Sequence, residues 1–115
     1  MHHKINYIEM PSLDLEKTKA FYTQAFGWSF KDYGKEYTAI QQAGIDGGFF
    51  LTPKVASSRG DMPLVVLYSQ DLEASLNSLE LIDTKITQNI FSFPGGRRFH
   101  FADPSGNELA VWSDK

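Results

Sequence analysis

Glu9 is the first residue of the chain whose type and position could do chemistry. It lies in a predicted strand between Ile8 and Met10, where carboxylates are rare. A carboxylate that is buried beside apolar side chains has a raised pKa and can accept a proton from a bound molecule. Glu9 is therefore a candidate general base. The alternatives are a solvated strand residue or a carboxylate paired with Arg97 or Arg98.

Glu108, Arg97 and His100 are three further candidates. Glu108 begins a predicted strand, where it is either solvated or part of a ligand site. The fork of donors on Arg97 could bind an anionic group, or the side chain could lie in water on a loop. His100 stands between Phe99 and Phe101 and is either a hydrogen-bonded sheet histidine or a proton carrier.

A scaffold of strands and helices must position these residues. A predicted strand over residues 5–10 leads into a helix over 15–25, which Asp14 caps and Gly27 ends. Three short strands are then predicted over residues 28–33, 37–41 and 48–51.

The same order of elements occurs a second time. A strand over 64–68 precedes a helix over 72–81, and Asp71 caps this helix 57 positions after Asp14 (71 − 14). Three more strands are predicted over residues 85–88, 98–102 and 108–112. The sequence therefore predicts an α+β fold made of two βαβββ repeats. The predicted boundaries are one domain over 1–115, repeats over 4–52 and 63–114, and a linker over 53–62.

Composition and charge exclude several classes of function. The net charge is −3 and the longest basic run is Arg97-Arg98, whereas nucleic-acid binding needs clustered Lys and Arg. No apolar run reaches the length of about 18 residues that a membrane span needs. The chain has no cysteine, which excludes disulfides and a cysteine-ligated zinc site. We expect a cytoplasmic protein with neither nucleic acid nor membrane as a partner.

Two segments resemble the signature motifs of a known family. Residues 14–28 and residues 101–107 are similar to the opening and closing motifs of glyoxalase/bleomycin-resistance proteins, the vicinal-oxygen-chelate superfamily. Gly95-Gly96-Arg97 and Glu9 resemble a glyoxalase-related subgroup. The resemblance covers almost the whole chain. It implies that the two repeats form curved mixed sheets facing each other around a cavity, and that the protein is a homodimer.

The resemblance also implies four metal-ligand positions, which in metal-dependent relatives carry His and Glu. In this chain these positions fall on Tyr7, Phe49, Leu64 and Ala110. A hydrocarbon side chain has no lone pair to offer, and a neutral Tyr is a poor ligand for a divalent cation. We therefore expect no metal, no other cofactor and no metal-dependent glyoxalase reaction.

Side chains alternate along a strand, so further residues should share the face of Tyr7 and Ala110. The expected ligand-binding residues, besides Glu9, are Tyr7, Phe49, Leu64, Tyr68, Arg97, Glu108, Ala110 and Trp112. Aromatic walls with a few polar groups suit a small-molecule pocket. The alternative is that the aromatic rings fill a core.

Three functions remain open from the sequence. The favoured one is a metal-free protein that binds, and so sequesters, an antibiotic or metabolite of unknown identity, as bleomycin-resistance proteins do. The second is a metal-independent isomerase or lyase with Glu9 as general base. The third is a non-catalytic dimeric accessory domain whose cavity is filled by side chains. Binding without turnover would distinguish the first function from the second.

Overall fold

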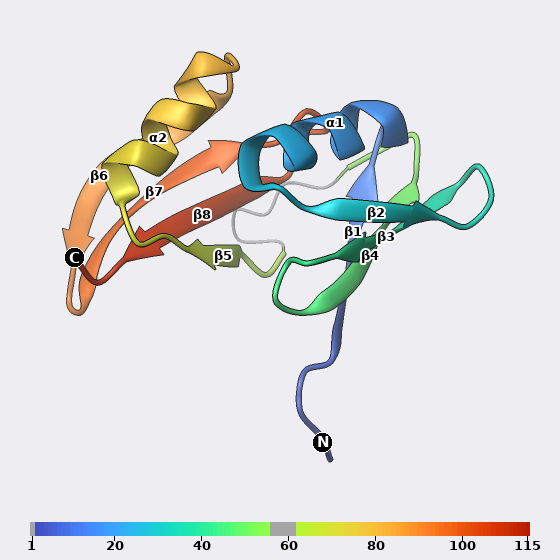
Figure 1. Cartoon of the computed structure of the whole chain (residues 1–115), viewed down its shortest axis with the longest axis horizontal. Helices are drawn as coiled ribbons and strands as arrows, with labels where there is room; N and C mark the ends of the chain where they lie inside the picture. Colours follow the sequence, from blue (N-terminus) through green and yellow to red (C-terminus); the bar gives the residue numbers. More distant parts are fainter. Residues whose placement is uncertain (1, 56–61) are drawn as a thin grey trace. The chain divides into compact units, whose positions relative to one another are not determined.

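The computed structural model describes residues 2–55 and 62–115, so most of the predicted linker over 53–62 lies outside the described residues. The chain divides into two compact units, Met1–Val55 and Ala56–Lys115. Each unit contains a helix and a four-stranded mixed sheet (Figure 1). The predicted α+β fold with two βαβββ repeats is confirmed. The assignment of residues 1–115 to a single domain stays a prediction.

The first unit contains one helix and four strands among its described residues. They are β1 (Tyr7–Ser12), α1 (Leu15–Phe26), β2 (Ser29–Asp32), β3 (Tyr37–Gln41) and β4 (Asp46–Leu51). The strand order is β1-β4-β3-β2, with β1 parallel to β4. The Asp14 carboxylate accepts from the backbone N–H of Lys17, and Gly27 ends α1 at a φ of 74°, as predicted.

Strand β1 runs two residues further than the sequence predicts, because Pro11 does not end it. Pro11 is paired with Phe50 of β4, and β1 has a neighbour on one side only. A proline fits an edge strand because its missing N–H can lie on the unpaired side.

The core of the first unit lies between α1 and one face of the sheet. Tyr22 of α1 is fully buried. Its ring stacks on Trp28 with a centroid separation of 4.7 Å and lies 5.2 Å from the ring of Phe49. Phe49 is itself fully buried, so this aromatic cluster fixes which face of the sheet α1 covers.

The second unit repeats this arrangement among its described residues. Its elements are β5 (Val65–Tyr68), α2 (Leu72–Leu81), β6 (Lys85–Phe93), β7 (Gly96–Ala102) and β8 (Glu108–Ser113). The strand order is β5-β8-β7-β6, with β5 parallel to β8. The helix α2 has the predicted bounds, and the carboxylate of its N-cap Asp71 accepts from the backbone N–H of Ala74.

Strand β6 is about twice as long as predicted. Its register with β7 shifts between Ile86 and Gln88 and again between Gln88 and Phe91. Such irregularities interrupt side-chain alternation, and this is why the sequence pattern ends the strand too early.

The two repeats share a side-chain hydrogen bond as well as an order of elements. The Ser12 Oγ lies 2.7 Å from the Thr18 Oγ1. At the corresponding place in the second unit, 57 positions later (69 − 12), the Ser69 Oγ lies 2.7 Å from the Ser75 Oγ. In both units the first serine also accepts from the backbone N–H of the N-cap aspartate. The internal repeat therefore extends to individual hydrogen bonds.

Within the described residues, neither helix is long and apolar enough to cross a membrane.

Candidate functional site

Each sheet has one face covered by its own helix and a second face, called here its helix-free face. Paired residues on neighbouring strands point to the same side. The register of the first sheet pairs Glu9 with Gly48 and Tyr37 with Phe50. The helix-free face of the first sheet therefore carries these four residues and Tyr7.

Two tyrosines and a glutamate form a hydrogen-bond chain on this face. The hydroxyl of Tyr37 donates to Oε2 of Glu9 at 2.9 Å and lies 2.6 Å from the hydroxyl of Tyr7. Since the Tyr37 proton goes to Glu9, the Tyr7 hydroxyl donates to the Tyr37 oxygen. The Tyr7 oxygen is left with acceptor capacity for a ligand.

Gly48 makes this chain possible, because Tyr37 reaches from β3 across β4 to β1. A Cβ at position 48 would overlap the hydroxyl end of the Tyr37 ring. Desolvation by burial raises the pKa of Tyr37, and its hydrogen bonds to Tyr7 and Glu9 raise it further. Tyr37 therefore stays protonated and remains a donor to Glu9.

The structure changes two expectations for the first unit. Phe49 does not share a face with Tyr7: it is paired with Met10, packs against Tyr22 and is fully buried on the helix side. Glu9 is exposed, whereas the general-base hypothesis starts from a buried carboxylate. Tyr7 is 46% exposed on the expected face.

The helix-free face of the second sheet gathers more aromatic side chains. The register pairs Val66 with Ala110 and Tyr68 with Trp112, so these four residues share the face. The ring centroids of Tyr68 and Trp112 are 5.3 Å apart in an edge-on arrangement. Leu64 lies just before β5 and is half-buried.

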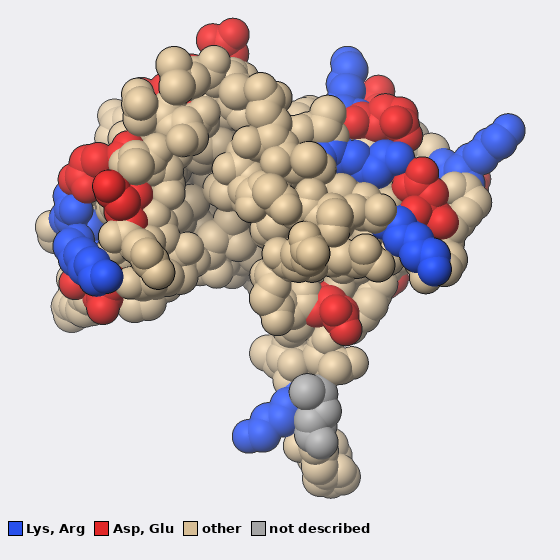
Figure 2. Space-filling view, viewed as in Figure 1, with Lys and Arg blue, Asp and Glu red and all other residues tan. Residues whose placement is uncertain are grey.

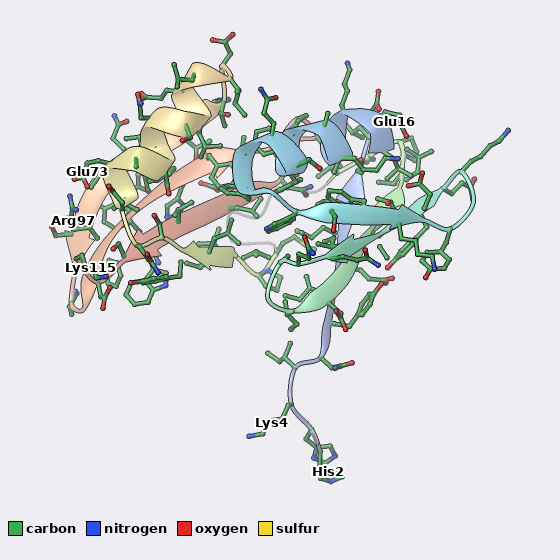
Figure 3. All side chains as sticks on the ribbon, viewed as in Figure 1. His2, Lys4, Glu16, Glu73, Arg97 and Lys115 are labelled. Atoms are coloured by element: carbon green, nitrogen blue, oxygen red, sulfur yellow. The ribbon has the colours of Figure 1, made fainter. Side chains whose placement is uncertain are left out.

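Arg97 does not lie on this face, contrary to its place in the predicted ligand-binding set. It is paired with Ser113 on the helix side of β7. Its guanidinium donates to both carboxylate oxygens of Glu73 and to the backbone carbonyl of Lys115, and the three residues gather at one edge of the unit (Figure 3). Side chains alternate along a strand, so Arg98, and not Arg97, lies on the helix-free face.

Arg98 is a candidate site residue that is absent from the set expected from the sequence. It is paired with Trp112, and its Cζ lies 5.2 Å and 5.5 Å from the ring centroids of Phe91 and Phe93. Alternation in β7 was the available signal: Phe99 and Phe101 are core residues, so Arg98 must point the other way.

His100 and Glu108 form the second polar contact on this face. The Nδ1 of His100 lies 3.2 Å from Oε2 of Glu108, and the hydroxyl of Thr87 donates to the same oxygen at 2.9 Å. Both side chains of the His100–Glu108 pair are 10% exposed. Glu108 is thus held by side chains, and the solvated alternative does not apply.

No metal-binding cluster is present in the part of the chain that the structure describes. Within residues 2–55 and 62–115, no three His, Cys, Asp or Glu side chains come together in a group that could hold a metal ion. On the face of the molecule shown in Figure 2, described acidic and basic residues alternate without forming a large patch of one sign.

Solved structures with the same fold come from several kinds of protein. A genomically encoded fosfomycin resistance protein from Listeria monocytogenes is 14% identical, with a TM-score of 0.83 over 98% of this chain and 94% of that chain. A lactoylglutathione lyase from Agrobacterium tumefaciens is 17% identical, with a TM-score of 0.74 over 96% of this chain and 93% of that chain. A bleomycin resistance determinant encoded on the transposon Tn5 is 19% identical, with a TM-score of 0.74 over 96% of this chain and 97% of that chain.

These identities are low, so the three structures establish the fold alone. No curated protein matches the chain. The family model of the Glyoxalase/Bleomycin resistance protein/Dioxygenase superfamily matches residues 4–111. Since this match covers nearly the whole sequence, the chain belongs to that superfamily.

Proposed function

We propose that this protein binds a small organic molecule without a metal ion and acts by sequestering it. The observation that carries the proposal is the make-up of the helix-free faces, where hydrogen-bonding groups stand among aromatic rings. Tyr68, Trp112 and Phe93 form such a surface around Arg98 in the second unit. A binding site needs this combination of apolar contact and a few oriented polar groups.

The residues at the implied metal positions support a metal-free mode of binding. Tyr7, Leu64 and Ala110 stand at three of them. On β4 the helix-free face carries Gly48 in place of the expected Phe49. None of these side chains is a good ligand for a divalent cation, so correcting the register on β4 does not restore a metal site.

Membership of the superfamily supports the same proposal. Two of the similar structures are named for resistance to an antibiotic, bleomycin or fosfomycin. A resistance protein that only binds needs affinity and no reacting group. This chain offers donors, acceptors and rings on its helix-free faces, so sequestration is the simplest function that its residues can perform.

The experiment that tests the proposal uses the two tryptophans as reporters of different places. Trp28 is buried on the helix side of the first sheet, whereas Trp112 lies on the helix-free face of the second. A small-molecule library is screened for compounds that raise the melting temperature, because a ligand of the folded state stabilises it. Each hit is then titrated against Trp28→Phe, whose fluorescence comes from Trp112, and against the matched control Trp112→Phe.

We expect saturable quenching in Trp28→Phe and little change in Trp112→Phe. Mass spectrometry after prolonged incubation should recover the ligand chemically unchanged. A chemically converted ligand would overturn sequestration in favour of an enzyme, and a library without any stabilising compound would favour the accessory-domain function.

A metal-independent isomerase or lyase is the second candidate, and the Tyr7–Tyr37–Glu9 hydrogen-bond chain is the observation that favours it. A proton taken up by Glu9 could be shared along this chain. If any compound is turned over, Glu9→Gln should abolish turnover while the thermal stability is retained. Turnover that survives in Glu9→Gln would remove Glu9 from the mechanism.

A homodimer is the assembly that we propose. Large side chains on the helix-free faces are exposed in the single chain, among them Tyr7 at 46%, Phe50 at 39%, Val66 at 42% and Tyr68 at 50%. Exposed apolar surface of this kind marks interaction sites. Sedimentation velocity should give a dimer at micromolar concentration, and a monomer at every concentration tested would contradict the proposal.

A further inference from the structure

Two buried nitrogen atoms on one face of β7 have no hydrogen-bond partner among the described residues. They are the Nε of Arg98 and the Nε2 of His100. A buried polar atom without a partner destabilises the fold, so each such atom calls for an explanation. Here two of them stand on alternate residues of one strand and therefore point to the same side of the sheet.

The His100 side chain is oriented by its neighbours. The Glu108 carboxylate can only accept, so the Nδ1 of His100 donates to it, and Thr87 donates to the same oxygen. This arrangement fixes the ring and leaves Nε2 on the side away from Glu108. His100 is 8% exposed, so a ligand atom that reaches Nε2 would meet it out of bulk water, where a hydrogen bond is strong.

The Arg98 side chain is held by aromatic rings. Its guanidinium lies over Phe91 and Phe93, and cation–π contacts of this kind stabilise the position of the cation. No described carboxylate forms an ion pair with Arg98, whereas Arg97 next to it is paired with Glu73. Arg98 therefore presents a positive charge for which the fold supplies no described counter-ion.

We propose that the helix-free face of the second sheet binds an organic anion, whose oxygens accept hydrogen bonds from the Arg98 Nε and from the Nε2 of His100 in its imidazolium form, in which both ring nitrogens donate. Alternate residues of a strand are roughly 7 Å apart. The two side chains therefore start from backbone positions near enough for both to contact one anionic ligand. The inference rests on the proposed small-molecule binding and adds the chemical class of the ligand.

The aromatic surroundings determine the rest of the ligand. The Phe93 and Trp112 ring centroids are 6.3 Å apart, and Tyr68 continues this surface beyond Trp112. Rings of this kind favour flat apolar partners. The ligand class is therefore a planar, largely apolar molecule that carries a carboxylate or a comparable anionic group.

The test uses two probes of the same shape and different charge, 2-naphthoate and the neutral 2-naphthamide. Their affinities for the wild-type protein are measured by isothermal titration calorimetry. The same measurements are made on Arg98→Gln, on His100→Gln and on the matched control Arg97→Gln, whose side chain lies on the helix side of the same strand. Thermal unfolding and far-ultraviolet circular dichroism confirm that each variant is folded.

We expect 2-naphthoate to bind the wild-type protein at least about ten-fold more tightly than 2-naphthamide, as a charge-assisted hydrogen bond allows. Arg98→Gln and His100→Gln should each remove most of this preference, whereas Arg97→Gln should keep it. In a two-dimensional proton–nitrogen spectrum of the imidazoles, 2-naphthoate should shift the His100 Nε2 signal.

Three results would overturn the inference. They are equal affinities for the two probes, a preference that Arg97→Gln removes and Arg98→Gln keeps, and no detectable binding of 2-naphthoate at millimolar concentration. If neutral library compounds still bind when 2-naphthoate does not, the proposed function stands and the anion inference alone fails. If 2-naphthoate binds as expected but the library ligand is chemically converted, the sequestering function alone fails.

Discussion

Arg97 and Arg98 are neighbours in the sequence, yet their side chains leave opposite faces of β7. Arg97 donates to Glu73 on α2, whereas Arg98 lies over Phe91 and Phe93 of β6. One arginine therefore connects a helix to the sheet, and the other places a charge among aromatic rings. Substituting one should leave the surroundings of the other unchanged.

Replacing Glu73 with Gln should lower the free energy of unfolding at neutral pH and change it little at acid pH. The Arg97 guanidinium holds the pKa of Glu73 below its ordinary value of 4.5. Because the folded pKa is the lower one, this carboxylate stabilises the fold above the unfolded pKa, and the contribution is lost as pH falls through the folded pKa. Urea unfolding at pH 7 and in steps below pH 4.5 measures the difference.

The effect of Glu73→Gln should be small, since the Arg97 and Glu73 side chains are 32% and 62% exposed and solvent screens their interaction. The variant should be less stable than the wild-type protein at pH 7, and the two unfolding curves should converge at acid pH. A deficit of constant size across the whole pH range would show that the ion pair is not its cause.

Removing the Ser12 hydroxyl should cost more than removing its counterpart in the second repeat. Ser12 and Thr18 are both fully buried, so Ser12→Ala leaves the Thr18 hydroxyl without its partner at a cost of about 1–3 kcal/mol. Ser69 is less buried, and Ser69→Ala should cost less because water can replace the lost hydroxyl. Chemical unfolding of both variants tests the order, and equal losses would contradict it.

Local signals in the sequence predicted the helices and their order well. Asp14, Asp71 and Gly27 act within one turn of the helix ends that they determine, so no long-range information is needed to place them. The duplicated order of elements then fixes the fold class. The strand ends were less predictable. Whether Pro11 can continue β1 depends on which edge of that strand is paired, and the length of β6 depends on shifts in its pairing with β7.

The sequence was least informative about which face of a sheet each strand side chain occupies. A shift of one residue moves a side chain to the other side of a sheet. In β4 the run Gly47-Gly48-Phe49-Phe50 shows no alternation of polar and apolar residues that would predict its two faces, and Phe49 belongs to the core. The Tyr37–Glu9 hydrogen bond depends on β4 lying between β1 and β3, a neighbourhood that no local pattern contains.

Substituting Gly48 with Ala should break the hydrogen-bond chain on the first sheet. The new Cβ would overlap the Tyr37 ring, and overpacking of this kind costs about 1–3 kcal/mol. Urea unfolding measures the loss in Gly48→Ala, in Tyr37→Ala and in the double variant Gly48→Ala/Tyr37→Ala. Because the ring is the obstacle, the double variant should lose less than the sum of the two single variants. Additive losses would place the strain elsewhere.

Chelation should leave the protein and its ligand binding unchanged. Tyr7, Leu64 and Ala110 offer no suitable ligand at the implied metal positions. Metal analysis of the purified protein should find no divalent ion at stoichiometric level, and an excess of EDTA should not lower the melting temperature. A stoichiometric metal, or a melting temperature that falls with EDTA and recovers with added metal, would refute the metal-free proposal.

Replacing Tyr37 with Phe should reduce the loss of stability at alkaline pH. Burial, and then the hydrogen bonds to Tyr7 and Glu9, raise the pKa of Tyr37 above its ordinary value of 10.0. The unfolded chain loses this proton first, so the stabilising contribution is complete below pH 10.0 and falls as pH rises toward the folded pKa. Unfolding free energies of the wild-type protein and Tyr37→Phe between pH 8 and pH 11 should converge as pH rises.

Tyr33→Phe, which alters an exposed tyrosine, is the control and should follow the wild-type profile. If Tyr37→Phe has the same alkaline slope as the wild-type protein, the Tyr37 hydroxyl does not hold its proton in the folded state.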